Sequence, residues 1–169
     1  GTSITLKDDK VVDIKAGRDA KVTFTLKQNV SDSIVAGRTV DFTVDGGYIF
    51  GETITTPAGL EIVDVEFKDD KKETKLITGF TAKVKEVKKS YEFKDVKVVG
   101  TLGNAGDITL KAEGRAIGQE LETVIAKVNA SVKVETQAAK LEVGVREQKG
   151  GKITITETAK EMIEKGNIV

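Results

Sequence analysis

The sequence predicts an all-β protein, namely an antiparallel β-sandwich of the immunoglobulin-like or jelly-roll-like kind with one or two short helical turns. Apolar residues recur at every second position in about a dozen short stretches, which is the period of a half-buried strand. Stretches rich in Gly, Asp and Lys separate them at roughly 8–12-residue intervals, as in sandwiches and barrels. Helical periodicity is scarce, so alternating βαβ units are not expected.

In each predicted strand the apolar side chains share one face, and the polar residues between them point the other way. Strands with one polar face favour antiparallel sheets. In chain order the predicted strands are 4–6, 12–14, 22–26, 40–44, 62–67, 80–84, 91–93, 96–98, 108–112, 119–128, 132–134, 141–145 and 153–155. The stretch 119–128 fits a helix as well as a strand, and its strand-rich surroundings favour the strand.

Two stretches predict the short helical turns. One is VSDSIVAG at 30–37 and the other is TAKEMIEKG at 158–166, and each ends at a glycine in the position that commonly stops a helix. The glycines of VDGGYIFG at 44–51 lack the strand-to-helix context of a phosphate-binding loop, so we interpret them as a turn.

Composition excludes several classes of protein. The charges balance, with 27 Lys and Arg against 27 Asp and Glu, whereas a nucleic-acid-binding protein shows a basic excess. No apolar run approaches the ~20 residues of a membrane span. The chain has no Cys and no His, and therefore no thiolate nucleophile, no Ser-His-Asp triad and no ordinary zinc or copper site. We expect no enzyme and no cofactor.

Carboxylates are the remaining candidates for chemistry. Asp8, Asp9, Asp69, Asp70 and Asp107 lie in predicted turns, where Asp is favoured for its own bonds to the backbone. A glycosidase pair is the weaker interpretation of these residues. Calcium is the one metal whose oxygen ligands are present, but no D-x-D-x-D-G loop occurs and Lys residues are interleaved with the acids. Solvated turns are the favoured interpretation, with calcium as the alternative.

Aromatic residues limit the sugar-binding surfaces that the chain could form, because Trp is absent and there are only 2 Tyr. Tyr91 alternates with Phe93, which favours a place in the core. Tyr48 lies among glycines that would let the edge of a ligand approach. We therefore predict Tyr48 as the candidate ligand contact.

Two segments share one pattern. Residues 23–40 and 152–169 each run from an alternating strand through a polar turn to a glycine and a new strand, and an offset of 129 residues places Gly37 on Gly166. Chance is the alternative to a true repeat. We predict one sandwich module over 1–169, in which 129–169 begins the next repeat and docks onto it.

The residues from 103 onward resemble the repeat of clostridial surface-layer and copper-amine-oxidase-domain-type cell-surface proteins. A Gly-Asp turn opens a strand at 106–107, an AKV strand follows at 126–128, and a VGVREQ segment occupies 143–148. An ITITET strand then enters a small helix, over 153–166. The resemblance covers 103–169 well and 20–50 loosely.

This resemblance implies an extracellular module at the cell surface or cell wall that acts as a spacer or lattice subunit. Its implied partners are neighbouring repeats of the same chain, copies of itself or cell-wall polysaccharide. Oxidase activity is not implied, because copper amine oxidases need histidine ligands and the chain has none. The wall-anchoring repeats typical of such proteins are also missing. The alternative is a carbohydrate-binding or cohesin-like module of a cell-surface enzyme complex.

Overall fold

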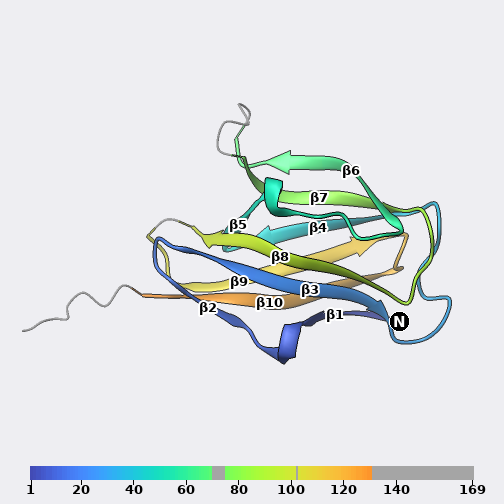
Figure 1. Cartoon of the computed structure of the whole chain (residues 1–169), viewed down its shortest axis with the longest axis horizontal. Coiled ribbons are helices and arrows are strands. Elements are labelled where there is room, and N and C mark those ends of the chain that lie inside the picture. The colour runs from blue at the N-terminus through green and yellow to red at the C-terminus, as the bar shows by residue number, and fades with distance from the viewer. Residues whose placement is uncertain (70–74, 102, 131–169) are drawn as a thin grey trace, which may run out of the picture. The chain divides into compact units, whose positions relative to one another are not determined.

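A computed structural model describes residues 1–69, 75–101 and 103–130, and it confirms the all-β prediction (Figure 1). The described residues contain ten strands and two 3-10 turns, and no α-helix. The strands are β1 (Thr2–Leu6), β2 (Val12–Lys15), β3 (Asp19–Gln28), β4 (Thr39–Asp45), β5 (Gly47–Phe50), β6 (Leu60–Phe67), β7 (Leu76–Val84), β8 (Ser90–Gly100), β9 (Gly106–Gly114) and β10 (Gln119–Asn129). The 3-10 turns are η1 (Lys7–Asp9) and η2 (Gly51–Thr53).

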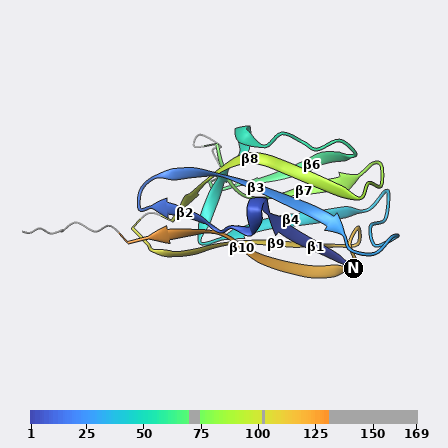
Figure 2. The same cartoon turned by 60° about the horizontal axis from the view of Figure 1, so that its bottom comes forward.

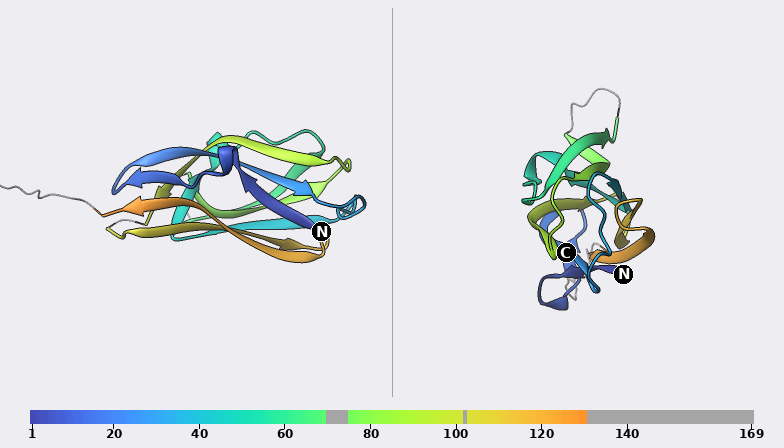
Figure 3. Two further views of the ribbon diagram at one scale, coloured as in Figure 1. Left: turned by 90° about the horizontal axis from the view of Figure 1, so that it is seen from below. Right: turned by 90° about the vertical axis from the view of Figure 1, so that its right-hand side faces the viewer.

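The strands form one hydrogen-bonded sheet that curls into two facing layers. Its order is β1-β3-β8-β5-β7-β4-β9-β10-β2, and β6 also pairs with β7. One layer contains β1, β3 and β8, and the other contains β2, β10, β9, β4 and β7 (Figure 3). The antiparallel prediction holds for every pair except β2 and β10, which run parallel.

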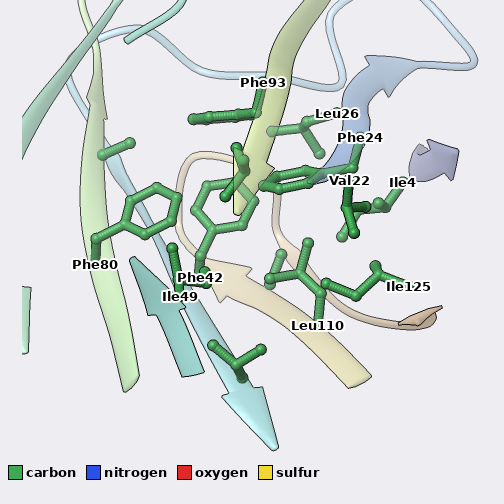
Figure 4. Close-up of a cluster of buried hydrophobic side chains, with 14 of the residues drawn as sticks. Ile4, Val22, Phe24, Leu26, Phe42, Ile49, Phe80, Phe93, Leu110 and Ile125 are labelled. Atoms are coloured by element: carbon green, nitrogen blue, oxygen red, sulfur yellow. The ribbon is translucent and has the colours of Figure 1, made fainter. Parts of the chain in front are cut away.

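Four phenylalanines join the two layers at the centre of the core (Figure 4). The rings of Phe24 and Phe93 stack within one layer at 4.9 Å between centroids, and those of Phe42 and Phe80 stack within the other at 4.9 Å. Phe42 then meets Phe93 edge-on at 5.4 Å. All four side chains are buried, so the alternation of the sequence builds a continuous apolar interior.

The predicted glycine turn at 44–51 is partly wrong, because it contains the short strand β5. Gly46 has φ +82°, and a Cβ there would lie 2.2 Å from the carbonyl oxygen of Asp107. Only glycine tolerates both constraints. The chain therefore bends sharply after β4, which pairs with β9, and continues as β5, which pairs with β8 in the other layer.

The predicted helical turn at 30–37 is wrong. The segment forms non-helical turns, in which the side-chain oxygen of Gln28 accepts hydrogen bonds from the backbone N–H groups of Ser33 (2.7 Å) and Ile34 (3.1 Å). These bonds satisfy the backbone in place of helical ones. Gly37 nevertheless has the expected left-handed conformation, with φ +82°.

Strand β8 unites two stretches that the sequence predicts as separate strands, 91–93 and 96–98. A β-bulge divides its register with β3, because Phe93 pairs with Phe24 and Val96 pairs with Val22. Asp95 in the bulge has φ +53° and donates its backbone N–H to the hydroxyl of Thr23 at 3.0 Å. The bulge keeps the apolar residues on both sides of it facing the core.

Other predicted features fall outside the described residues. These are the strands 132–134, 141–145 and 153–155, the helical turn 158–166 and, beyond residue 130, the proposed repeat start. The described sandwich is the unit Gly1–Ala130, and the domain arrangement of 1–169 stays a prediction.

The sandwich has two ends, which we call proximal and distal. The proximal end holds Thr2 and the loops 29–38, 85–89 and 115–118, whereas the distal end holds the segments 16–18 and 103–105, Gly46 and the end of β10. In Figure 1 the N-terminus marks the proximal end, and β10 leaves at the opposite end.

Candidate functional site

The predicted ligand contact, Tyr48, lies on the outer side of β5. Alternation along this strand buries Gly47 and Ile49 and leaves Tyr48 and Phe50 half-buried, pointing outward. The ammonium nitrogen of Lys68 lies 5.2 Å from the centre of the Tyr48 ring. We call Tyr48, Phe50, Lys68 and Lys97 the aromatic–lysine patch.

The second half of the aromatic–lysine patch consists of Phe50 and Lys97, and Thr53 of η2 holds these two residues in place. The ammonium nitrogen of Lys97, on β8, lies 5.6 Å from the centre of the Phe50 ring. The hydroxyl of Thr53 donates a hydrogen bond to the carbonyl of Phe50 (2.7 Å) and accepts one from the backbone N–H of Lys97 (2.9 Å). These bonds fix β5 beside β8. The patch therefore offers flat apolar rings next to cationic hydrogen-bond donors.

The glycines before Tyr48 have a different role from the predicted one. A Cβ on Gly47 would lie 2.5 Å from the carbonyl oxygen of Val99 and 2.8 Å from the side chain of Ile108. The space beside Gly47 is therefore filled by the protein itself. These glycines let neighbouring strands pack closely, and they do not open a path for a ligand.

A groove of about 310 Å³ begins immediately after Phe50. Its lining is mainly apolar and comes from η2, β6 and β7, and it consists of Gly51, Glu52, Ile54, Ile62, Val65, Phe67, Lys75 and Ile77. Glu52 and Lys75 form an ion pair of 3.3 Å, and both side chains are mostly exposed. The groove is small for a ligand site, at the lower end of ~300–1,000 Å³.

A second hollow, of about 410 Å³, lies over β4, β6 and β7 and is lined by several acids. Its carboxylates come from Asp41, Asp64, Glu66 and Glu113. Asp41 accepts a hydrogen bond of 2.6 Å from the hydroxyl of Thr81. Alternation alone could not predict this hollow, because each acid occupies an ordinary solvent-facing position of a strand.

The aspartates considered for calcium are distributed among different elements. Asp8 and Asp9 belong to η1, where both have positive φ (58° and 53°), a conformation that Asp tolerates better than most residues. Asp69 lies shortly after β6 and Asp107 is the second residue of β9, whereas Asp70 lies outside the described residues. Within 1–69, 75–101 and 103–130, no three Asp or Glu side chains come together in a way that could hold a metal ion.

Tyr91 lies in the core, as its alternation with Phe93 predicts, and is 1% exposed. Its hydroxyl donates a hydrogen bond to the carbonyl of Glu86 (2.7 Å) and accepts one from the backbone N–H of Lys88 (2.9 Å). Burial raises the pKa of the phenol above its ordinary value, and the charge of Glu86 adds to this rise, although the bond from Lys88 partly opposes it. Tyr91 thus anchors the loop between β7 and β8.

Comparison with known proteins gives neither a family nor a curated relative. No family model matches the chain, and no curated protein matches it either. Among the described residues, no helix has the length and apolar character needed to cross a membrane.

Several solved structures are similar to the chain, and three of them are described below. The first is a cohesin module of a Clostridium perfringens family 33 glycoside hydrolase (15% identity, 77% of this chain and 98% of that one, TM-score 0.43). The second is a Nocardia farcinica protein with an immunoglobulin-like fold (12%, 71% and 82%, 0.36). The third is self-complemented MyfA, the major subunit of Myf fimbriae of Yersinia enterocolitica, in complex with galactose (12%, 75% and 98%, 0.31). At these identities and scores, the likenesses do not say what this chain binds.

Proposed function

We propose that the chain is a non-catalytic structural module of an extracellular, surface-layer or cell-wall-associated protein, in which it acts as a spacer. The observation that carries the proposal is the position of the two points where the chain joins the sandwich. The two points lie at opposite ends of the sandwich, so modules linked in series would be arranged end to end.

Two sets of contacts support this geometry. At the proximal end, the side-chain oxygen of Gln119 accepts hydrogen bonds from the backbone N–H (2.8 Å) and the hydroxyl (2.9 Å) of Thr2. The start of β1 therefore lies beside the start of β10. From there β10 runs for 11 residues, which at ~3.4 Å per residue is about 35 Å, and it ends beside Lys15 at the distal end.

The surface of the sandwich also supports a structural role. Two of its features, the aromatic–lysine patch and the acidic hollow, lie on the outer faces of the strands. Neither combines a nucleophile, a general base and an oxyanion-binding site, which is the arrangement that hydrolytic catalysis needs. Membership of a surface layer is the finer part of the proposal, and it rests on the resemblance of residues 103–169 to surface-layer repeats.

The spacer proposal can be tested by small-angle X-ray scattering of two complete chains joined head to tail in one polypeptide. We expect the maximum dimension to exceed that of the single chain by at least about 35 Å, the length of β10. A matched control carries a flexible Gly-Ser linker between the copies. A tandem that folds back side by side, with a smaller increase than this, would contradict the spacer.

A binding module is the second candidate, and the aromatic–lysine patch favours it. Aromatic rings with adjacent donors suit a polysaccharide that stacks on the rings and hydrogen-bonds through its hydroxyl or carboxylate groups. Both rings, however, already have a lysine ammonium over them, and a sugar would have to displace it.

This second function is tested by retention on cellulose, chitin and peptidoglycan. We expect Tyr48→Ala to weaken retention without lowering the melting temperature, because the side chain points outward. Tyr48→Phe is the matched control that keeps the ring. If the wild-type chain is not retained on any of the three polymers, the binding function is wrong.

A further inference from the structure

We propose that the parallel pair β2–β10, together with β1–β3, forms a clamp that is loaded in shear when the sandwich is stretched between its two ends. The inference rests on the proposed spacer function, since only a module linked in series experiences such a load. It adds a property that the spacer alone does not require, namely resistance to unfolding by force.

The direction of β2 and β10 is the first argument. Their register is Val12 with Ala126 through Lys15 with Asn129, and both strands run toward the distal end (Figures 2 and 3). The chain reaches β2 from the proximal end through β1, whereas β10 leads out at the distal end. Tension between the ends therefore slides β2 and β10 past each other along their axes. In such sliding, the hydrogen bonds of the ladder are strained together.

The attachment of β1 is the second argument. β1 pairs antiparallel with β3 over five residues, from Thr2 opposite Gln28 to Leu6 opposite Phe24. A pull on Thr2 toward the proximal side acts along this ladder, so the five pairs also carry the load together. The Thr2–Gln119 hydrogen bonds join the starts of β1 and β10, which the same tension drives in opposite directions.

The burial of the parallel pair is the third argument. Ile14 of β2 is 2% exposed and Val128 of β10 is 4% exposed. Val128 packs so closely on β8 that a Cβ on Gly100 would lie 2.6 Å from its Cγ2 atom. These side chains keep water from one face of the ladder. Hydrogen bonds in a dry environment are electrostatically stronger, and water cannot easily replace them as they stretch.

A different pair of attachment points provides the contrast. Arg18 lies in the turn just after β2, at the distal end, and Ala130 follows β10 at the same end. Tension between Arg18 and Ala130 lifts the ends of β2 and β10 apart. The ladder then opens one pair at a time, so the load falls on a single hydrogen bond at each moment. The fold that is pulled is the same in both directions.

The test is single-molecule force spectroscopy on the full chain. Because the chain has no cysteine, handles attach only where one is introduced. One version carries an added cysteine ahead of Gly1 together with Ala130→Cys, and the other carries Arg18→Cys with Ala130→Cys. We expect the unfolding force to be at least about twofold higher in the first version, since forced unfolding follows the unfolding rate and not the equilibrium free energy. Equal forces, or a lower force in the first version, would overturn the clamp.

A pair of core variants sharpens the test. Ile14→Ala lies in the clamp, and Leu60→Ala lies on β6, outside the path of the load, and both residues are buried. We expect Ile14→Ala to lower the end-to-end unfolding force more than Leu60→Ala does at a comparable loss of thermal stability. The milder Ile14→Val serves if Ile14→Ala does not fold. Equal effects of the two variants on the force would contradict the clamp.

Failure of this inference can be told apart from failure of the spacer. The scattering of the joined chains depends on where the chain enters and leaves the described sandwich, whereas the force ratio depends on the directions of β1, β2 and β10. An extended tandem with equal unfolding forces in the two pulling directions would support the spacer function and contradict the clamp.

Discussion

The two ends of the sandwich are held together in different ways. At the proximal end, polar side chains reach across loops and bind the backbone of distant segments. At the distal end, the chain is held by close approaches at Gly46, Gly47 and Gly100, whereas at the proximal end close approaches at Gly59 and Gly114 only supplement the polar side chains.

Three side chains organise the proximal end. Gln28 accepts two backbone hydrogen bonds from the loop 29–38, and its amide nitrogen donates to the carbonyl of Lys88 at 3.0 Å. Tyr91 bonds the loop 85–89 with its hydroxyl, and Gln119 binds the N-terminal residues. Because such bonds are directional, each can be removed individually at a moderate cost in stability.

Close backbone approaches organise the distal end. A side chain on Gly46 would strike the carbonyl of Asp107, one on Gly47 would strike that of Val99, and one on Gly100 would strike Val128. The backbone N–H of Thr101 also donates to the carbonyl of Gly46 at 3.2 Å. These contacts have almost no room to relax, so a single methyl group is more disruptive here than a lost hydrogen bond at the other end.

The largest expected effect follows at Gly46. Gly46→Ala should lower the free energy of unfolding by at least about 3 kcal/mol, because the new Cβ meets a carbonyl oxygen and the residue has positive φ. Urea denaturation measures the loss. Gly17→Ala is the matched control, since Gly17 has a similar φ of +78° with nothing within 4 Å, and it should cost only about 1–2 kcal/mol. Equal losses would show that the close approach does not matter.

The next effect is at Tyr91. Tyr91→Phe keeps the ring but removes the hydroxyl from Glu86 and Lys88, and it should cost about 1–3 kcal/mol, as measured by urea denaturation. A loss of unfolding free energy as large as that caused by Gly46→Ala would contradict the expectation that a lost hydrogen bond at the proximal end costs less than a side chain at Gly46.

The pH dependence of stability isolates the same hydroxyl. The pKa of Tyr91 is raised in the folded protein, so above about pH 10 the unfolded chain loses this proton first and the native state becomes less stable. The stability that this group contributes is fully present below that pH. It is lost as the pH rises toward the raised pKa. Subtracting the Tyr91→Phe curve from the wild-type curve should leave this alkaline loss, and a flat difference would contradict it.

A smaller effect is expected at Gln28. Gln28→Ala removes one acceptor and one donor that join the loop 29–38 to Lys88, and we expect a loss of about 1–2 kcal/mol. Hydrogen exchange of the Ser33 and Ile34 amides should accelerate more than that of amides in β9. Uniform acceleration across the sandwich would show that Gln28 acts on global stability alone.

The smallest effect is expected at an exposed ion pair. Lys111 lies 2.8 Å from Asp45, and its pKa is raised mainly by the hydrogen bond to this carboxylate. Both side chains are largely exposed, at 46% and 67%, so water and salt screen the attraction. Lys111→Met should leave the denaturation midpoint within experimental error. A clear drop in the midpoint would show that this exposed ion pair contributes measurably to stability.

Alternation was enough to predict most of the strands, because burying one face is a local property of the chain. It missed β5, where the pair Gly46–Gly47 has the composition of a turn but forms a corner between the two layers. It also divided β8 at the bulge around Asp95, since a bulge interrupts the period of two that the pattern detects. Both errors occur where tertiary contacts decide the backbone.

The pairing of strands could not be predicted from alternation. The parallel pair β2–β10 joins residues more than one hundred positions apart, and nothing in Val12–Lys15 specifies a partner. For the same reason the sequence pointed to one residue of the aromatic–lysine patch, Tyr48, whose role as a ligand contact stays a prediction. Lys68, just after β6, and Lys97, on β8, reach the patch from other parts of the chain and had no local signal.

The parallel pair also determines when the sandwich can be completed during synthesis. Val12 pairs with Ala126, so β2 has to wait for the last described strand to emerge from the ribosome. Until then the nascent chain exposes unpaired strand edges and apolar faces, which favours aggregation. Partners this remote in sequence also make folding slow. The strand that completes the described sandwich is thus the last of the described strands to be made, and this part of the nascent chain is most vulnerable just before β10 is complete.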